Sequence, residues 1–405
     1  MSKQQFEEST DNYEELEEES RSIIMGLISQ LRKGSDLSRI TLPTFVLEPR
    51  SLLEKLTDFM SHPEFVVKAS RTADPVQRFV EICRFFLSGW HVKPKGVKKP
   101  YNPVLGEFFR CEYKLKDGSK AMYLAEQVSH HPPISAYYYT LPELGIFVTG
   151  EAHPKAKFLG NSAATIMKGY SRIVFSELKN ETYEITNPNV YARVGKMVME
   201  MGDQSTIRCA STGLVCELDF KTKGFFSGQY HSVTGKIKRE STGEVLYDIS
   251  GVWTEELFIK GKNACKESFF KVSNHAVIHK LVEPLENQEP NESKKLWSKV
   301  TAGLVAKDMD TATNEKTFIE DKQRAETAAR VREGVQWHPR FFCLNDKEEY
   351  EFHGAKGIDY KNLHQTSEHL EKYIFSHTTG LHSTTERFMA DQPVVAERKS
   401  ITACI

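Results

Sequence analysis

A change in hydrophobic period near Glu107 constrains the fold more than any other feature of the sequence. From this point apolar and polar residues alternate, which is typical of half-buried strands. Residues 107–115 and 120–128 flank Asp117-Gly118, a strong hairpin signal. Further strand-like runs lie at 146–152, 164–176, 182–186 and 196–200, with hairpin turns at 211–213 and 241–243. Such a series of short adjacent strands predicts an antiparallel meander, and hence a barrel or a sandwich.

Upstream of this point the apolar residues recur at helical spacing. Residues 22–31 predict a short amphipathic helix, and a second apolar stripe covers residues 52–60. A third helix has clear boundaries, because Asp74 can cap it, Pro75 suits its first turn and Gly89 can end it. Near the other end of the chain, residues 284–296 resemble a linker and residues 316–333 form a charged helix. The last sixty residues have no clear pattern.

Composition narrows the class of protein. The chain has 405 residues, of which 39% are hydrophobic, enough for a sizeable core. Its seven cysteines are odd in number and scattered, which indicates reduced thiols in the cytosol. The start is acidic, unlike a secretory leader. No apolar run approaches the roughly 20 residues of a membrane span, so any membrane contact would be peripheral.

The net charge of −1 is unevenly distributed along the chain. Residues 1–20 hold eight acidic side chains and one lysine, a charge of −7, which leaves +6 for the remainder. We expect this tail to be disordered. It is either a solvated end or a segment that repels anionic membranes or shields a basic rim until release.

The most specific string is Glu126-Gln127-Val128-Ser129-His130-His131-Pro132-Pro133. It places two adjacent imidazoles at the end of a strand, and Pro132 forces His131 into an extended conformation. Two imidazoles can have a structural role at the corner before the prolines, donate hydrogen bonds to an anion such as phosphate, or bind a metal. A metal site needs further ligands, and none is evident nearby.

Two other stretches can bind an anion. The first has lysines at positions 93, 95, 98 and 99, followed by Pro-Tyr-Asn-Pro-Val-Leu-Gly-Glu at 100–107. In the second, Lys316, Glu320 and Arg324 recur at i, i+4 and i+8, nearly one face of a helix. Each stretch is either an ordinary solvated face or a set of donors for a head group. Nucleic acid fits poorly, because the body is only weakly basic and lacks a recognition motif.

Taken together, these strings resemble the oxysterol-binding-protein-related family. The signature EQVSHHPP carries the resemblance, which runs from about residue 23 to residue 342. Supporting strings are LPTFVLE at 42–48, KKPYNPVLGE at 98–107, FLGNS at 158–162 and GVQWHP at 334–339. They are most similar to the short yeast-type members that carry phosphatidylserine.

The resemblance implies a mainly β fold with α: a large incomplete antiparallel barrel around a lipid tunnel, with an N-terminal lid and a C-terminal helical segment. It also implies exchange of phosphatidylserine for phosphatidylinositol 4-phosphate, without enzymatic chemistry, cofactor or metal. The protein would act as a monomer at contacts between endoplasmic reticulum and plasma membrane. Residues 349–352, Glu-Tyr-Glu-Phe, faintly resemble a motif for endoplasmic-reticulum tethering receptors.

Nine lipid-binding residues follow from the resemblance, and they fall into four sets. Leu42 and Val46 belong to the lid, Lys99 and Asn102 contact phosphate in both lipids, His130, His131 and Arg324 hold the 4-phosphate, and Lys316 and Glu320 line the inositol. The implied organisation is an acidic tail at 1–20, a lipid-binding domain at 21–345 and an extension at 346–405. Within the domain we expect the lid at about 21–50, helices at about 51–90, the barrel at about 105–260 and the C-terminal segment at about 295–345.

The sequence departs from the family pattern in two places. Ala156 stands where the phosphatidylserine carriers have a serine that helps to hold the head group. About three residues are missing between Arg193 and Met197, which should alter strand register there. A sterol cargo therefore stays open, as does a phosphoinositide sensor without bulk transport.

Overall fold

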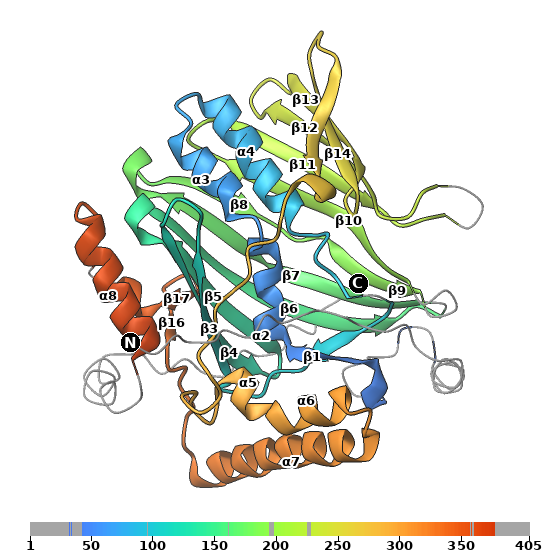
Figure 1. The fold of residues 1–405 in the computed structure, drawn as a ribbon, viewed down its shortest axis with the longest axis vertical. Helices are drawn as coiled ribbons and strands as arrows, with labels where there is room; N and C mark the ends of the chain where they lie inside the picture. The colour runs from blue at the N-terminus through green and yellow to red at the C-terminus, as the bar shows by residue number, and fades with distance from the viewer. Residues whose placement is uncertain are drawn as a thin grey trace.

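A computed structural model describes residues 32, 34, 43–94, 96–160, 162–193, 198–224, 228–356, 358 and 360–376. The acidic tail, the helix expected at 22–31 and Leu42 lie outside these residues. A 13-stranded sheet dominates the described chain and curves around a group of helices (Figure 1). Its two edge strands, β3 and β15, lie at opposite ends of the strand order. The fold is thus mainly β with α, as predicted.

The large sheet is an antiparallel meander with one departure from sequence order. Its strands are β3 (Phe108–Lys114), β4 (Lys120–His130), β5 (Pro133–Leu141), β6 (Ile146–Phe158), β7 (Ser162–Phe175), β8 (Glu181–Ile185), β9 (Asn189–Arg193), β10 (Val198–Cys209), β11 (Leu214–Lys221), β12 (Ser232–Arg239), β13 (Val245–Val252), β14 (Glu256–Gly261) and β15 (Lys266–Lys271). Only β9 leaves the path, because it pairs with both β7 and β10. The predicted hairpin at Asp117-Gly118 is confirmed: Lys114 faces Lys120, and Gly118 takes a left-handed φ of 87°.

Three helices pack against the concave side of the sheet (Figure 1). They are α2 (Leu52–Lys55), α3 (Pro63–Arg71) and α4 (Pro75–Ser88), with the 3₁₀ turn η3 (Leu56–Met60) after α2. The predicted cap of α4 is confirmed, since the Asp74 carboxylate accepts from the Gln77 backbone N–H at 2.7 Å. Gly89 follows the helix where a Cβ atom would lie 2.3 Å from the Phe59 Cα atom. The helix α3 lies within the region at about 51–90 where helices are expected, but its own boundaries were not predicted.

The segment after β15 folds back along the sheet and leads to three further helices. They are α5 (Ser293–Leu296), α6 (Ser298–Val305) and α7 (Met309–Glu333), and α6 and α7 pack against each other beyond one end of the sheet (Figure 1). The linker prediction for 284–296 was wrong. Glu292 is buried there, and its carboxylate accepts two hydrogen bonds at 3.2 Å from the buried Arg110 guanidinium of β3. The prediction was based on the polar composition of the segment, which does not indicate that one of its charged residues is buried.

The described residues from Phe342 onward pack on the convex side of the sheet (Figure 1). They form β16 (Phe342–Leu344), β17 (Tyr350–Phe352) and α8 (Leu363–Phe375). Phe352 is buried in a second core and stacks on Tyr138 of β5, with ring centroids 4.4 Å apart. Three of the residues 349–352 therefore belong to the strand β17, which is paired with β16, and this speaks against the receptor-motif interpretation of the stretch. The described secondary structure is completed by the parallel pair of β1 (Leu47–Ser51) and β2 (Lys99–Tyr101) and by short 3₁₀ turns. The turns are η2 (Thr44–Val46), η4 (Pro142–Leu144), η5 (Ser176–Leu178), η7 (Val272–Asn274) and η8 (His353–Ala355).

Candidate functional site

Four of the nine predicted residues converge at the end of the sheet covered by α7. Lys99 opens the short strand β2 (Lys99–Tyr101), His130 ends β4, and Lys316 and Glu320 lie one turn apart on α7. The Lys316 ammonium forms an ion pair with the Glu320 carboxylate at 2.6 Å. Both groups act electrostatically on Lys99, and Glu320 also acts on His130. Three sequence-distant segments thus bring cations, an imidazole and a carboxylate together.

A parallel strand pair fixes the position of Lys99. The strand β1 (Leu47–Ser51) pairs with β2, so that Leu47 lies opposite Lys99. The next lysine back, Lys98, donates to the Phe45 carbonyl oxygen at 2.9 Å. Val46 lies between these contacts, buried at 6% exposure. The described part of the LPTFVLE string is therefore packed directly beside the lysine run.

The same segment reaches α7 through two hydroxyl groups. The Thr44 and Thr313 Oγ1 atoms are 2.5 Å apart. The helix α7 is held at this end of the sheet by that contact and by its packing on α6. The position of Lys316 thus depends on residues that precede it by about 270 positions.

The loop that carries Asn102 is anchored by a buried carboxylate. Glu107 accepts hydrogen bonds from the Val104 backbone N–H at 3.1 Å, the Ser293 hydroxyl at 2.6 Å and the Trp297 indole N–H at 2.9 Å. Trp297 in turn stacks on Tyr101, with ring centroids 4.8 Å apart. Burial raises the pKa of Glu107, and these donors act in the opposite direction. The loop is therefore rigidly attached to α5 and α6, with Asn102 exposed on it.

The EQVSHHPP string begins with buried residues that hold the fold together and ends with residues that are at least partly exposed to solvent. Glu126 is buried and accepts from the Arg340 and Phe341 backbone N–H groups at 2.7 and 2.8 Å. Burial raises its pKa to about 7 despite these donors. His131 is exposed, and its ring centroid lies 4.6 Å from that of His130. Among the described residues no three His, Cys, Asp or Glu side chains are grouped as metal ligands.

A residue that the sequence analysis missed lies at the centre of this arrangement. The Gln323 Oε1 atom accepts from the Leu105 backbone N–H at 2.7 Å, and its Nε2 atom lies 2.8 Å from His130 Nε2. Gln323 follows Lys316 by seven residues, two helical turns, and so lies on the same face of α7. That spacing was the only signal in the sequence. A neutral glutamine was not considered as a site residue, because the prediction rested on charged side chains that can bind an anion.

The charged groups of the site influence one another's protonation. The pKa of Lys99 is lowered by loss of hydration and then by repulsion from Lys316, while Glu320 acts in the opposite direction. Solvent still reaches the Lys99 side chain. The pKa of His130 is lowered by burial and by His131. A bound anion would favour the charged forms of Lys99 and His130, because it would offset the loss of hydration and the repulsion between these groups.

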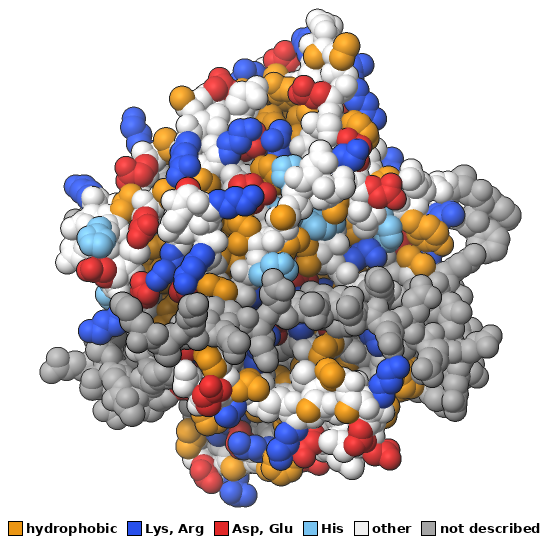
Figure 2. Space-filling view, viewed as in Figure 1, with side chains coloured by type: hydrophobic (Ala, Val, Ile, Leu, Met, Phe, Trp, Pro, Cys, Tyr) orange, Lys and Arg blue, Asp and Glu red, His pale blue; other side chains and the backbone are white. Residues whose placement is uncertain are grey.

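Arg324 lies at the edge of the site. Its guanidinium is 63% exposed and forms an ion pair with Asp321, three residues earlier on the helix. No contact between Arg324 and either histidine is seen among the described residues. An anion at the histidines would have to draw Arg324 away from Asp321. Elsewhere on α6 and α7, basic, acidic and hydrophobic side chains are mixed on the surface (Figure 2).

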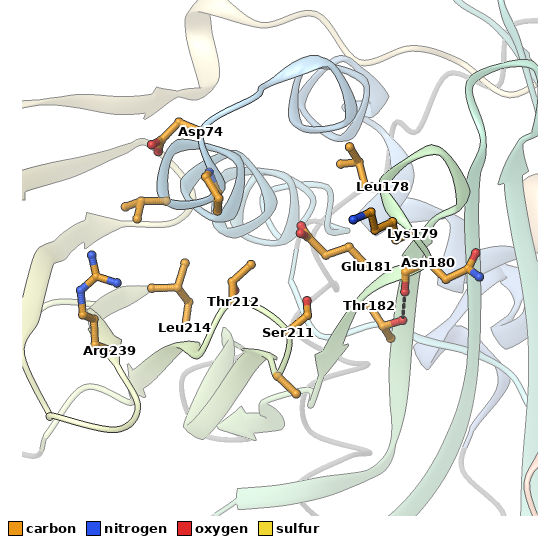
Figure 3. Close-up of a pocket in the computed structure, with 13 residues that line it drawn as sticks. Asp74, Leu178, Lys179, Asn180, Glu181, Thr182, Ser211, Thr212, Leu214 and Arg239 are labelled. Atoms are coloured by element: carbon orange, nitrogen blue, oxygen red, sulfur yellow. Dashed lines mark hydrogen bonds between the residues drawn. The ribbon is translucent and has the colours of Figure 1, made fainter.

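A cavity of about 740 Å³ lies in a different part of the molecule. It is bounded by the start of α4, the turn between β7 and β8, and the turn between β10 and β11 (Figure 3). Asp74, Lys179 and Arg239 lie apart from one another around the opening, while the Thr182 hydroxyl donates to the Asn180 carbonyl oxygen at 2.8 Å (Figure 3). None of the nine predicted residues lines it.

Comparison with known proteins identifies the family. The family model described as oxysterol-binding protein matches residues 26–307, more than half of the chain. The chain belongs to the oxysterol-binding protein family. An oxysterol-binding protein homolog of Schizosaccharomyces pombe is 48% identical over 352 residues, covering 83% of this chain and 73% of the relative. Oxysterol-binding protein homolog 6 of Saccharomyces cerevisiae is 42% identical, covering 82% and 76%.

Solved structures of other proteins share the fold. The Osh1 ORD domain in complex with cholesterol superposes with a TM-score of 0.70 at 23% identity, covering 86% of this chain and 88% of that one. The Saccharomyces cerevisiae Osh3 ORD in complex with PI(4)P gives a TM-score of 0.65 at 23% identity, covering 86% and 92%. Among the described helices, none is long and apolar enough to cross a membrane.

Ala156 and the shortened stretch can now be placed in the fold. Ala156 lies on β6 opposite Thr165 of β7, between the exposed Lys155 and Lys157 and on the same face as the buried Phe158. Arg193 of β9 faces Val198 of β10, so the shortened stretch belongs to the connection between these strands. Residues 194–197 themselves are outside the described residues.

Proposed function

We propose that this protein exchanges phosphatidylserine for phosphatidylinositol 4-phosphate between the endoplasmic reticulum and the plasma membrane. The observation that carries the proposal is the convergence of Lys99, His130 and the Lys316–Glu320 pair at one end of the sheet. Membership in the oxysterol-binding protein family supports it. The Osh3 ORD complex with PI(4)P shows that the shared fold can hold this lipid in a relative.

The chemistry of the site suits a phosphorylated inositol. A phosphate monoester carries close to two negative charges at neutral pH and accepts several hydrogen bonds. Lysine and imidazole groups supply charge and donors, and the Glu320 carboxylate can accept from sugar hydroxyls while it orients Lys316. Lys99 and Asn102 would contact the phosphate that both lipids share. His130, His131 and Arg324 would serve the 4-phosphate, which only the inositol lipid has.

The acyl chains require enclosure during transfer. Each methylene group exposed to water costs about 0.8 kcal/mol, so two chains cost on the order of 20 kcal/mol. We infer that the concave interior of the sheet accommodates them, with Leu42 and Val46 of the lid region against the head group or glycerol. Because two lipids compete for one site, unequal supply at two membranes drives directed exchange. No covalent chemistry, cofactor or metal is required.

The carrier would act as a monomer that binds anionic membranes peripherally. A tethering receptor at the endoplasmic reticulum would have to use a surface other than residues 349–352, because Phe352 is buried.

A two-population liposome assay tests the proposed function. Donor liposomes contain phosphatidylserine, acceptor liposomes contain phosphatidylinositol 4-phosphate, and separate fluorescent probes report each lipid. We expect counter-transport of the two lipids, each accelerated by a gradient of the other. Transport of ergosterol in place of phosphatidylserine would show a sterol carrier. Binding of phosphatidylinositol 4-phosphate without transfer of either lipid would show a sensor. Lipids that co-purify with the protein, identified by mass spectrometry, give an independent check.

A further inference from the structure

Gln323 joins three segments that are far apart in the sequence. It lies on α7, and its amide contacts both the loop after β2 and the end of β4. The Leu105 backbone N–H donates to Oε1 at 2.7 Å, and Nε2 lies 2.8 Å from His130 Nε2. The oxygen and the nitrogen of the Gln323 amide therefore each have a hydrogen-bond partner at the same time.

The backbone contact determines which way the amide points. The Leu105 N–H can only donate, so it must face the amide oxygen rather than the NH₂ group. The NH₂ group, which can also only donate, is then directed at His130 Nε2. A hydrogen bond at this distance requires a lone pair on Nε2. In a neutral imidazole the ring proton is then on Nδ1.

A charged His130 would be incompatible with this contact. An imidazolium carries a proton on both ring nitrogens, so its Nε2–H would face the NH₂ donor of Gln323. Rotation of the amide by 180° would relieve that conflict, but it would place NH₂ against the Leu105 N–H. One hydrogen bond is lost in either case.

We propose that Gln323 is a positioning residue that holds His130 neutral and protonated on Nδ1 in the lipid-free protein, and that this contact opens when His130 donates from Nε2 to a phosphate monoester. The identity of that monoester, phosphatidylinositol 4-phosphate, rests on the proposed function. The charge state of His130 in the free protein does not.

Other groups around His130 act in both directions. Burial and the neighbouring His131 lower its pKa, while the Pro103 carbonyl and Glu320 raise it. The charge of Glu320 is offset by its ion pair with Lys316 on the same helix. Apart from the Pro103 carbonyl, which acts on the imidazole as a backbone hydrogen-bond partner, the buried His130 Nδ1 has no partner among the described residues. An incoming phosphate dianion is therefore the strongest available partner for a charged His130.

Loading of a phosphate monoester would consequently take up a proton. The free protein holds His130 with a lowered pKa, and the bound phosphate raises that pKa. Affinity should then increase as the pH falls from 8 toward 6, until the phosphate itself becomes protonated near pH 6. Phosphatidylserine has no phosphate monoester, so its capture should change little over this range.

Nuclear magnetic resonance of the lipid-free full chain, labelled at histidine, tests the proposal. The His130 signals are assigned by their loss in His130→Phe. We expect the wild type to show unprotonated Nε2 and protonated Nδ1. In Gln323→Glu the carboxylate accepts from both Leu105 and His130, so the His130 pKa should rise by about 1–3 units. In Gln323→Met, which keeps the length but has no donor, it should rise less. Gln365→Met on α8 is the matched control and should leave His130 unchanged.

The outcomes separate a charge-setting role from a merely structural one. If both Gln323 variants lower the thermal midpoint but leave the His130 pKa and tautomer as in the wild type, the proposal is overturned. Extraction of phosphatidylinositol 4-phosphate from liposomes is then measured between pH 6 and 8. The pH midpoint should move upward in Gln323→Glu, whatever the absolute affinity, and an unmoved midpoint contradicts the proposal. Absence of extraction by the wild type at every pH would overturn the proposed function, while the resonance measurements still decide the role of Gln323.

Discussion

At the scale of single residues, Lys316 offers the clearest test of the site, because another lysine lies on the same helix outside it. Lys316 is 19% exposed and paired with Glu320, whereas Lys322 is 58% exposed. A hydrogen bond to a charged group contributes about 1.5–3 kcal/mol. Lys316→Ala should therefore weaken extraction of phosphatidylinositol 4-phosphate by about 10- to 100-fold. Lys322→Ala should leave extraction unchanged, and equal losses in both variants would mean that only the overall charge of α7 matters.

Ala156 is the residue at which we expect a substitution to change cargo preference. It lies on the face of β6 that carries the buried Phe158 and is itself only partly buried. Restoring the serine found in phosphatidylserine carriers adds one hydroxyl donor, which contributes about 0.5–1.5 kcal/mol when it is paired. Ala156→Ser should raise phosphatidylserine capture about two- to tenfold without affecting phosphatidylinositol 4-phosphate. Ala156→Cys has nearly the same size and a weaker donor, so a similar gain there would indicate packing rather than hydrogen bonding.

At the scale of elements, local sequence patterns predicted the features that depend on residues close together in the chain. The hairpin at Asp117-Gly118 and the cap at Asp74 depend on neighbours within a few residues, and both are confirmed. The sites of Lys99, His130 and Lys316 came from matching motifs. Gln323 was missed because its partners, Leu105 and His130, are about 200 positions away. The periodicity or composition of one segment cannot predict a contact with a residue so far away in the sequence.

The wrong linker prediction has the same cause. Glu292 and Arg110 read as ordinary surface charges, but they are 182 positions apart in sequence and buried against each other. Arg110 also donates to the Ile374 and Ser376 carbonyl oxygens at 2.9 and 3.1 Å. One guanidinium thus connects β3 to the segment before α5 and to the end of α8.

Arg110→Met should consequently destabilise the fold strongly. Removing one partner of a buried ion pair costs about 3–5 kcal/mol, because the other charge stays buried without compensation. We expect a clear decrease in the urea midpoint of unfolding. Arg208→Met on β10 is the control, because its pair with Glu240 is exposed and worth about 0–1 kcal/mol. Equal midpoints for the two variants would show that solvent compensates the Arg110 site.

At the scale of the whole molecule, the acidic start of the chain is the feature that no described contact explains. Residues 1–20 carry a charge of −7, against +6 for the rest of the protein. Because they precede the lid region in the sequence, we expect some of these charges to come close to a membrane that the lid contacts. Each charge near an anionic bilayer contributes about 1 kcal/mol, and the effect decays over roughly 8–10 Å at cellular salt. We expect only a few of the charges to lie within that distance at once.

Deleting residues 1–20 should therefore strengthen binding to phosphatidylserine-rich liposomes by a few kcal/mol at most. Co-sedimentation at low salt measures the gain, which should shrink as salt is added because the repulsion is screened. Binding to neutral liposomes should hardly change. A matched variant in which the eight acidic residues are replaced by their amides keeps the length of the tail and should reproduce the deletion. If the deletion strengthens binding and the amide variant does not, the tail acts by bulk; if neither does, it is a solvated end. Repulsion of this kind would shorten residence on each membrane and so favour repeated exchange.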